Sequence, residues 1–225
     1  MLSGAALYRI GRAFARGYRH FNIKVAPDPV FDLALCQQVR RLAPEGILWV
    51  DANGGYDERT ALEMAPRFAD LGMIAFEQPV AANRLSSLKR LKSQSALPIV
   101  LDEPIVSLAD MQEFHHLGLL DGVAIKVARC GGLTEAMRQV EFLQEHGLLF
   151  LGSGLTDPDI SLAASLCLFS AYEIPFPAAL NGPQFLTSSI LQNPLVPTGD
   201  EIPGPCGFGL GVEVDEELLS NHAID

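Results

Sequence analysis

Residues 47–57 read Ile-Leu-Trp-Val-Asp-Ala-Asn-Gly-Gly-Tyr-Asp, and this stretch contains a complete strand–loop–helix signal. The apolar run Ile47–Val50 predicts a strand that is buried on both faces, as in a parallel sheet. Asp51 ends the run with a carboxylate, and the two glycines after Asn53 favour a turn. Asp57 is a suitable helix cap. The stretch therefore predicts one βα unit with a charged residue at the end of its strand.

The same unit repeats along the chain. Helix starts are indicated at Asp28-Pro29, Ser107 and Asp157-Pro158, and a first helix at 5–16. We expect the helix capped by Asp57 to reach Phe68, with a kink or an early end at Pro66. Strand-like apolar runs lie at Phe21–Val25, Ile47–Val50, Met73–Phe76, Pro98–Leu101, Gly122–Val127, Leu148–Leu151 and Ala178–Leu180. Alternating strands and helices predict an α/β fold with a parallel sheet.

Five ionisable residues recur with the period of this repeat. They follow one another at intervals of 27, 26, 25 and 24 residues, each at or just past a predicted strand end: Lys24, Asp51, Glu77, Asp102 and Lys126. Roughly this length holds one βα unit of an eight-stranded TIM-like barrel, whose active site lies at the carboxyl ends of the strands. We therefore expect the five side chains to meet at the mouth of such a barrel.

Three carboxylates on consecutive strands predict a metal site. Asp51, Glu77 and Asp102 would repel one another if they were buried together without a cation. Oxygen ligands of this kind suit Mg²⁺, with Mn²⁺ as an alternative. Lys24 and Lys126 lie four predicted strands apart, so they would face a metal-bound substrate from opposite walls. That layout suits removal of a proton from one face of a carbon and its return to the other.

These residues resemble the enolase superfamily, in particular its branch of enzymes like muconate-lactonising enzyme and mandelate racemase. The resemblance covers residues 17–215. The segments that carry it are Phe21-Asn22-Ile23-Lys24-Val25, Val50-Asp51-Ala52-Asn53-Gly54-Gly55-Tyr56, Phe76-Glu77-Gln78-Pro79, Leu101-Asp102-Glu103-Pro104, Ile125-Lys126, Gly131-Gly132-Leu133-Thr134-Glu135 and Gly209-Leu210-Gly211-Val212.

The resemblance implies a role for each of the five residues. Asp51, Glu77 and Asp102 would be ligands of Mg²⁺, and Lys24 and Lys126 would be the acid/base pair. The implied reaction is abstraction of a proton α to a carboxylate through an enediolate intermediate. The implied outcomes are racemisation or epimerisation, cycloisomerisation, and dehydration, with a small carboxylate as substrate.

Two departures from the family pattern bear on activity. The family has Lys-x-Lys on the first of these strands, whereas this chain has Asn22 two residues before Lys24. Without the second charge we expect Lys24 to be a more alkaline base, and Asn22 is a candidate substrate-binding residue. The chain also begins within a barrel helix. We expect residues 1–225 to form a single, partial barrel domain without a capping domain or first strand, and irregular from about Gln184 onward.

Further candidate site residues have structural alternatives. Ser153 and Asp157 follow the sixth of the seven predicted strands and are candidates for substrate binding, with helix capping as the alternative for Asp157. Asn53 is a candidate for substrate binding or for orienting the metal shell, with a role in the turn as the alternative. The role of Asn181 is left open.

Composition excludes several other functions. The net charge is −11 with no basic cluster, which argues against nucleic acid as a partner. No apolar run reaches the roughly 20 residues of a membrane-spanning helix, and the first residues do not resemble a targeting signal. Four scattered cysteines favour a reducing, cytoplasmic location. A homo-oligomer, or a separate chain that supplies the cap, is the expected kind of protein partner.

Two rival hypotheses remain beside the enzyme. A truncated, non-enzymatic remnant of such a barrel would explain both departures. A Schiff-base aldolase using Lys126 would explain a lysine at a strand end, but it would leave three aligned carboxylates without a role.

Overall fold

A computed structural model describes residues 4–182 and 185–222 of the chain. Six parallel strands form one curled sheet in the order of the sequence, β1-β2-β3-β4-β5-β6. Their bounds are β1 Phe21–Lys24, β2 Leu48–Asp51, β3 Met73–Glu77, β4 Ile99–Leu101, β5 Gly122–Ile125 and β6 Leu149–Gly152. These strands confirm six of the seven predicted runs, and the curled parallel sheet confirms the predicted TIM-like architecture.

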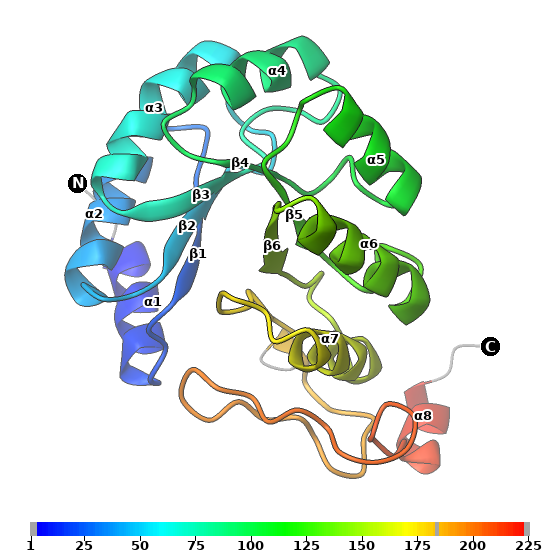
Figure 1. Cartoon of the computed structure of the whole chain (residues 1–225). Helices are drawn as coiled ribbons and strands as arrows, with labels where there is room; N and C mark the ends of the chain where they lie inside the picture. The colour runs from blue at the N-terminus through cyan, green and yellow to red at the C-terminus, as the bar shows by residue number, and fades with distance from the viewer. Residues whose placement is uncertain (1–3, 183–184, 223–225) are drawn as a thin grey trace.

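Helices connect the strands and cover the convex side of the sheet. Figure 1 shows α2–α6 in an arc around the sheet, with α7 and the irregular C-terminal segment on the remaining side. The helix bounds are α1 Gly4–Ala15, α2 Pro29–Leu42, α3 Glu58–Asp70, α4 Leu85–Gln94, α5 Leu108–His116, α6 Leu133–Glu145, α7 Asp159–Ala171 and α8 Glu216–His222. In the described part of the chain, no helix is long and apolar enough to cross a membrane.

Helix caps explain where several helices begin. The Asp28 carboxylate accepts hydrogen bonds from the backbone N–H groups of Val30 and Phe31, with Pro29 in the first turn of α2. Asp57 caps α3 through Thr60 N, and Ser107 caps α5 through Asp110 N. Each of these caps was predicted, because a side-chain oxygen satisfies an otherwise unpaired donor of the first turn.

Three local predictions were wrong. Helix α3 continues past Pro66 to Asp70, because Pro66 is exposed while Met64 and Phe68 bury the opposite face. Asp157 caps no helix: Pro158 precedes α7, and its position has no side-chain cap. The seventh run, 178–180, forms only an isolated bridge between Ser153 and Ala179.

Prolines account for the missing seventh strand. Pro175 and Pro177 stand just before the run and supply no backbone N–H to a ladder. The bridge rests on one hydrogen bond, from Ala179 N to Gly152 O at 2.9 Å. The segment 185–215 is irregular, with isolated bridges such as the antiparallel one between Leu191 and Val214, and α8 follows it. Gln184, its predicted start, lies outside the described residues.

Two hydrophobic clusters hold the sheet. The larger lies between the strands and the helices, and includes Phe68, Phe76 and Leu101. The smaller lies on the concave side, where alternate strand residues meet: Trp49, Ala75, Val100, Ala124 and Leu151. Because side chains alternate across a strand, the residue two places after an inward-facing one faces inward too. Asp51 and Glu77 occupy that position after Trp49 and Ala75.

Candidate active site

The strand register places the predicted residues side by side at one edge of the sheet. Lys24 pairs with Asp51 across β1 and β2, and Asp51 pairs with Glu77 across β2 and β3. Asp102 follows the last residue of β4, and Lys126 follows the last residue of β5. The sequence repeat thus becomes a row of charged side chains at the carboxyl ends of five neighbouring strands.

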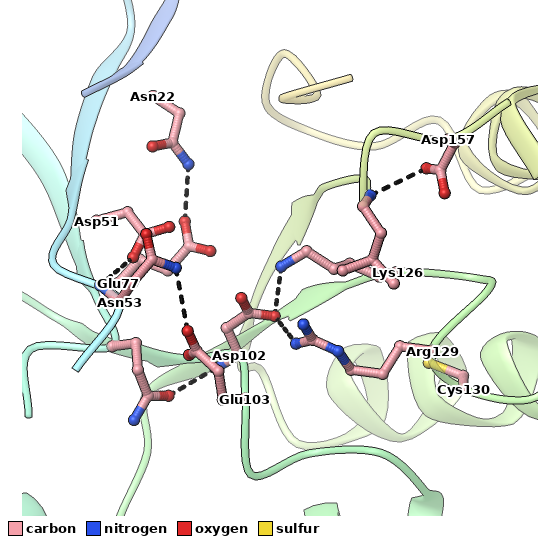
Figure 2. A network of polar contacts seen from close by, with 12 residues as sticks. Asn22, Asp51, Asn53, Glu77, Asp102, Glu103, Lys126, Arg129, Cys130 and Asp157 are labelled. Carbon is pink, nitrogen blue, oxygen red and sulfur yellow. Dashed lines mark hydrogen bonds and ion pairs between the residues drawn. The ribbon is translucent and has the colours of Figure 1, made fainter. Parts of the chain in front are cut away.

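The three carboxylates converge. One oxygen each from Asp51, Glu77 and Asp102 lies within 4.8 Å of the other two, and all three residues are buried. Their exposed fractions are 0%, 1% and 2%. Figure 2 shows the three side chains directed toward one space, with Lys126 and Arg129 approaching Asp102. Buried carboxylates this close together require compensating positive charge.

Cationic side chains contact the two outer carboxylates. Lys24 Nζ donates to Asp51 Oδ2, while Lys126 Nζ and Arg129 both donate to Asp102 Oδ1. The two lysines therefore flank the triad from its two ends, as the spacing predicted. Their surroundings differ, since the Lys24 side chain is 64% exposed and that of Lys126 only 7%.

The middle carboxylate has neutral partners. Glu77 Oε2 accepts hydrogen bonds from Asn22 Nδ2 at 2.9 Å and from Trp49 Nε1 at 2.8 Å. Its other oxygen, Oε1, is buried and has no hydrogen-bond partner among the described residues. Such an atom is costly to bury unless a ligand meets it. With three converging hard oxygens, the donor set therefore fits Mg²⁺ or Mn²⁺.

Burial and charge shift the pKa values in the site. Desolvation, reinforced by the neighbouring Asp51 carboxylate, raises the pKa of Glu77 to about 8. Burial lowers the pKa of Lys24, but the ion pair with Asp51 outweighs this effect, so the net pKa of Lys24 is raised. The cause of this rise is the Asp51 carboxylate, and the effect expected from Asn22 stays a prediction.

The other predicted site residues divide into two groups. Asn22 and Ser153 line a cavity of about 710 Å³ together with Lys24 and Lys126. Asn53 lies on the turn after β2, where its N–H donates to Asp51 Oδ1 at 2.8 Å and its amide to Glu103 Oε1 at 3.0 Å. Its φ of 44° also suits the turn. Asn53 is not among the residues that line the cavity, and a part in orienting a metal ligand stays a prediction.

Asp157 does not join the cavity lining. It is buried at 3% exposure, and its carboxylate accepts a 3.3 Å hydrogen bond from Leu155 N. Burial raises its pKa. Asn181 holds the same loop, accepting from Thr156 N through its side chain and from Asp157 N through its backbone. These contacts give Asn181 a structural part in this loop.

Sequence reasoning missed three residues of the site. Arg129 reaches Asp102 because a turn after β5 brings its N–H to Lys126 O. Trp49 reaches Glu77 from within β2, two residues before Asp51. Gln78 links two strand ends, since its amide accepts from Asp102 N at 3.1 Å and donates to Val80 O at 2.8 Å. Period-two alternation could have identified Trp49, but Arg129 and Gln78 depend on loop conformations.

Comparison with known proteins identifies the family. A family model described as Enolase C-terminal domain-like matches residues 7–218. Chloromuconate cycloisomerase from Pseudomonas putida is 30% identical over 91% of this chain and 56% of its own length. Muconate cycloisomerase 1 from Rhodococcus opacus is 31% identical over 89% of this chain and 55% of its own length.

A relative with another reaction and two solved structures extend the comparison. N-succinylamino acid racemase from Amycolatopsis is 30% identical over 93% of this chain and 56% of its own length. Muconate lactonizing enzyme from Klebsiella pneumoniae superposes with a TM-score of 0.90 at 25% identity, covering 100% of this chain and 64% of that one. Muconate cycloisomerase from Pseudomonas fluorescens gives 0.88 at 27% identity, over 97% and 63%.

The matches cover a similar share of each curated relative. This chain spans a little over half the length of the curated relatives that it matches. Within that span the family model, the sequence relatives and the solved structures agree with one another. The chain belongs to the Enolase C-terminal domain-like family of the enolase superfamily.

Proposed function

We propose that this chain carries the catalytic barrel of a Mg²⁺-dependent enzyme that removes a proton α to a carboxylate. The observation behind this proposal is the convergence of Asp51, Glu77 and Asp102 within 4.8 Å, with a lysine at each end of the triad. A non-enzymatic barrel gains nothing from three buried carboxylates with like charge, because burying them together is costly.

The triad and the lysines would have different roles in the reaction. Asp51, Glu77 and Asp102 would hold Mg²⁺, with Mn²⁺ as a substitute, and the ion would supply positive charge to the substrate carboxylate as the α proton leaves. A lysine Nζ in its neutral form would accept that proton, while the C–H electron pair stays on the substrate. Lys24 and Lys126 line one cavity, so a substrate placed there would meet an amine from each side.

The lysine that acts as base must be unprotonated in part. The Asp51 carboxylate raises the pKa of Lys24 and so opposes this role. A divalent cation beside Asp51 would draw its charge away from Lys24 and lower that pKa. At the other end of the triad, Arg129 donates to the same oxygen of Asp102 as Lys126, so a second cation stands beside that lysine.

The relatives suggest two outcomes for the proposed proton transfer. Muconate cycloisomerases and an N-succinylamino acid racemase are similar to this chain at 30–31% identity. A racemase-type reaction would use both lysines, one to remove the proton and the other to return a proton to the opposite face. A cycloisomerase-type reaction would need only one of them as base or acid. Small carboxylates of these two kinds are therefore the substrates to test.

The test is hydrogen exchange at the α carbon. The chain is incubated in D₂O with Mg²⁺ and a set of N-succinylamino acids, and deuterium incorporation is followed by NMR, with muconate turnover assayed in parallel. We expect incorporation that falls at least about 100-fold in Lys24→Ala and Lys126→Ala. Lys89→Ala, at an exposed position of α4, is the matched control and should be unaffected.

The same test distinguishes an enzyme from a non-enzymatic remnant of such a barrel. No exchange or turnover with any substrate, in a folded chain that binds Mn²⁺, would favour the non-enzymatic remnant. Exchange that persists in both lysine variants would refute the assigned acid/base pair.

We propose a location from the cysteines and a partner from the length of the matched relatives. The four cysteines are all free thiols, which fits a reducing cytoplasm. We further propose that a capping segment, from the same or a separate chain, completes the substrate site, because the matched relatives are nearly twice as long. A homo-oligomer is the other partner that we would look for.

A further inference from the structure

The surroundings of Glu77 differ from those of the other two carboxylates. Asp51 and Asp102 each contact a cationic side chain, whereas both donors to Glu77 are neutral: the Asn22 amide and the Trp49 indole. A neutral donor fixes the orientation of a carboxylate without cancelling its charge. These two donors therefore orient Glu77 without balancing the charge of its carboxylate form, which leaves that charge to another partner.

Both donors bind the same oxygen. Asn22 Nδ2 and Trp49 Nε1 lie 2.9 and 2.8 Å from Glu77 Oε2, and the buried Oε1 has no hydrogen-bond partner among the described residues. Two bonds to one oxygen prevent the carboxylate from rotating freely. They leave Oε1 as the oxygen available to a ligand. Figure 2 shows the Asn22 amide meeting the Glu77 carboxylate from the β1 side.

The fold makes Trp49 a rigid donor. It is 1% exposed and packs on the concave side of the sheet with Ala75, Val100, Ala124 and Leu151. It stands two residues before Asp51 on β2, so both side chains face inward. Asn22 is its direct neighbour across the β1–β2 ladder. Packing thus fixes the position of the indole N–H that donates to Glu77.

We propose that Trp49 and Asn22 are positioning residues that hold Glu77 with Oε1 presented to the divalent cation. This inference rests on the proposed function, because it requires that the triad binds a cation. It changes the part expected of Asn22, which holds a ligand residue in addition to lining the cavity. Loss of a group that orients a metal ligand typically weakens metal binding by about 10–100-fold.

The experiment measures Mn²⁺ affinity directly. Free Mn²⁺ is followed by its EPR signal during titration of the wild-type chain and of Trp49→Phe, which keeps an aromatic ring but removes the N–H. We expect the dissociation constant to rise about 10-fold or more in Trp49→Phe. Val100→Ala removes packing from the same cluster and no hydrogen bond. It should lower the melting temperature while leaving Mn²⁺ affinity within about twofold of wild type.

A second variant tests the inference if Trp49→Phe does not fold. Asn22→Ala changes a half-buried residue on β1 and should raise the Mn²⁺ dissociation constant by a smaller factor, because the Trp49 bond remains. Trp49 is also the only tryptophan in the chain, so Mn²⁺ bound at Glu77 should quench its fluorescence at the same midpoint.

The outcomes separate this inference from the proposed function. Wild-type chain that binds no Mn²⁺ would overturn both. Wild-type binding with unchanged affinity in Trp49→Phe would overturn the positioning role and leave the metal site standing; where that variant does not fold, unchanged affinity in Asn22→Ala would do the same. Equal losses of affinity in Trp49→Phe and Val100→Ala would also overturn it, because general loosening of the interior would then be the cause.

Discussion

The two ends of the carboxylate triad contain the same kind of ion pair in different surroundings. At the β1 end, Lys24 contacts Asp51, and its side chain is 64% exposed on a strand with one neighbour in the sheet. At the β5 end, Lys126 contacts Asp102, and its side chain is 7% exposed on a strand between two neighbours. Arg129 adds a second cation there. Position in the sheet, more than residue type, thus decides how firmly each lysine is held.

The difference suggests different parts for the two lysines. Water can reach Lys24, so its ammonium is solvated even when Asp51 turns to another partner. Lys126 depends on Asp102 for its charge balance, because a buried ammonium without a partner is strongly unfavourable. We therefore infer that Lys24 is the more mobile group and that Lys126 is held in one place.

The largest expected effect is on stability, and it sharpens the comparison. In metal-free buffer, Asp102→Asn leaves the buried Lys126 without its partner and should lower the free energy of unfolding by about 3–5 kcal/mol. Asp51→Asn leaves the exposed Lys24 to water and should cost about 1 kcal/mol or less. Each variant relieves repulsion within the triad, so the difference between them isolates the surroundings of the lysines. Urea unfolding gives both values, and equal costs would contradict the comparison.

A smaller effect concerns how the β1 end is anchored. Asp32 accepts hydrogen bonds from Ala26 N at 2.8 Å and from the Tyr56 hydroxyl at 2.5 Å, which ties the loop after Lys24 to the loop after Asp51. Tyr56→Phe removes one of these bonds and should cost about 1–2 kcal/mol. If Lys24 is positioned through this link, the same variant should also reduce α-proton exchange. Exchange at the wild-type rate would show that the link serves stability alone.

The same anchor predicts a dependence on pH. Burial raises the pKa of Asp32. The folded chain therefore binds this proton more tightly than the unfolded chain, whose Asp pKa is about 3.9. The contribution of Asp32 to the free energy of unfolding should fall as pH rises from that value through the raised folded pKa. Urea unfolding measured at several pH values should show the free energy of unfolding of wild type falling over this range. The fall should be smaller in Asp32→Asn.

The smallest expected effect comes from an ion pair outside the site. Arg59 and Glu63 are paired at 3.2 Å on α3, with side chains 78% and 54% exposed. Arg59→Ala should change the free energy of unfolding by about 0.5 kcal/mol or less. It therefore serves as the baseline against which the two pairs of the triad are measured by the same unfolding method.

Sequence reasoning reached the residues that follow the strand–helix repeat. Asp51, Glu77 and Asp102 could be placed because each ends an apolar run, and the carboxyl ends of parallel strands share one edge. The caps at Asp28, Asp57 and Ser107 were predictable because they depend on local hydrogen bonds alone.

The rest depends on contacts that the repeat does not encode. Arg129 reaches Asp102 through a turn, and Gln78 joins two strand ends with φ of 37°. Asp157 was expected to cap α7, but it is the buried residue of a loop whose neighbouring residues are exposed, and its N–H donates to Asn181 O. The run 178–180 resembled a strand by its apolar character, although the prolines before it limit its pairing to one bridge.

The central claim is that the three carboxylates share one cation. The most direct measurement is a crystal structure of the chain grown with Mn²⁺, with anomalous diffraction data that locate the ion. We predict a single strong peak about 2.0–2.3 Å from one oxygen each of Asp51, Glu77 and Asp102, with Oε1 as the Glu77 ligand. A peak that contacts fewer than all three carboxylates, or no peak among them at saturating Mn²⁺, would contradict the account.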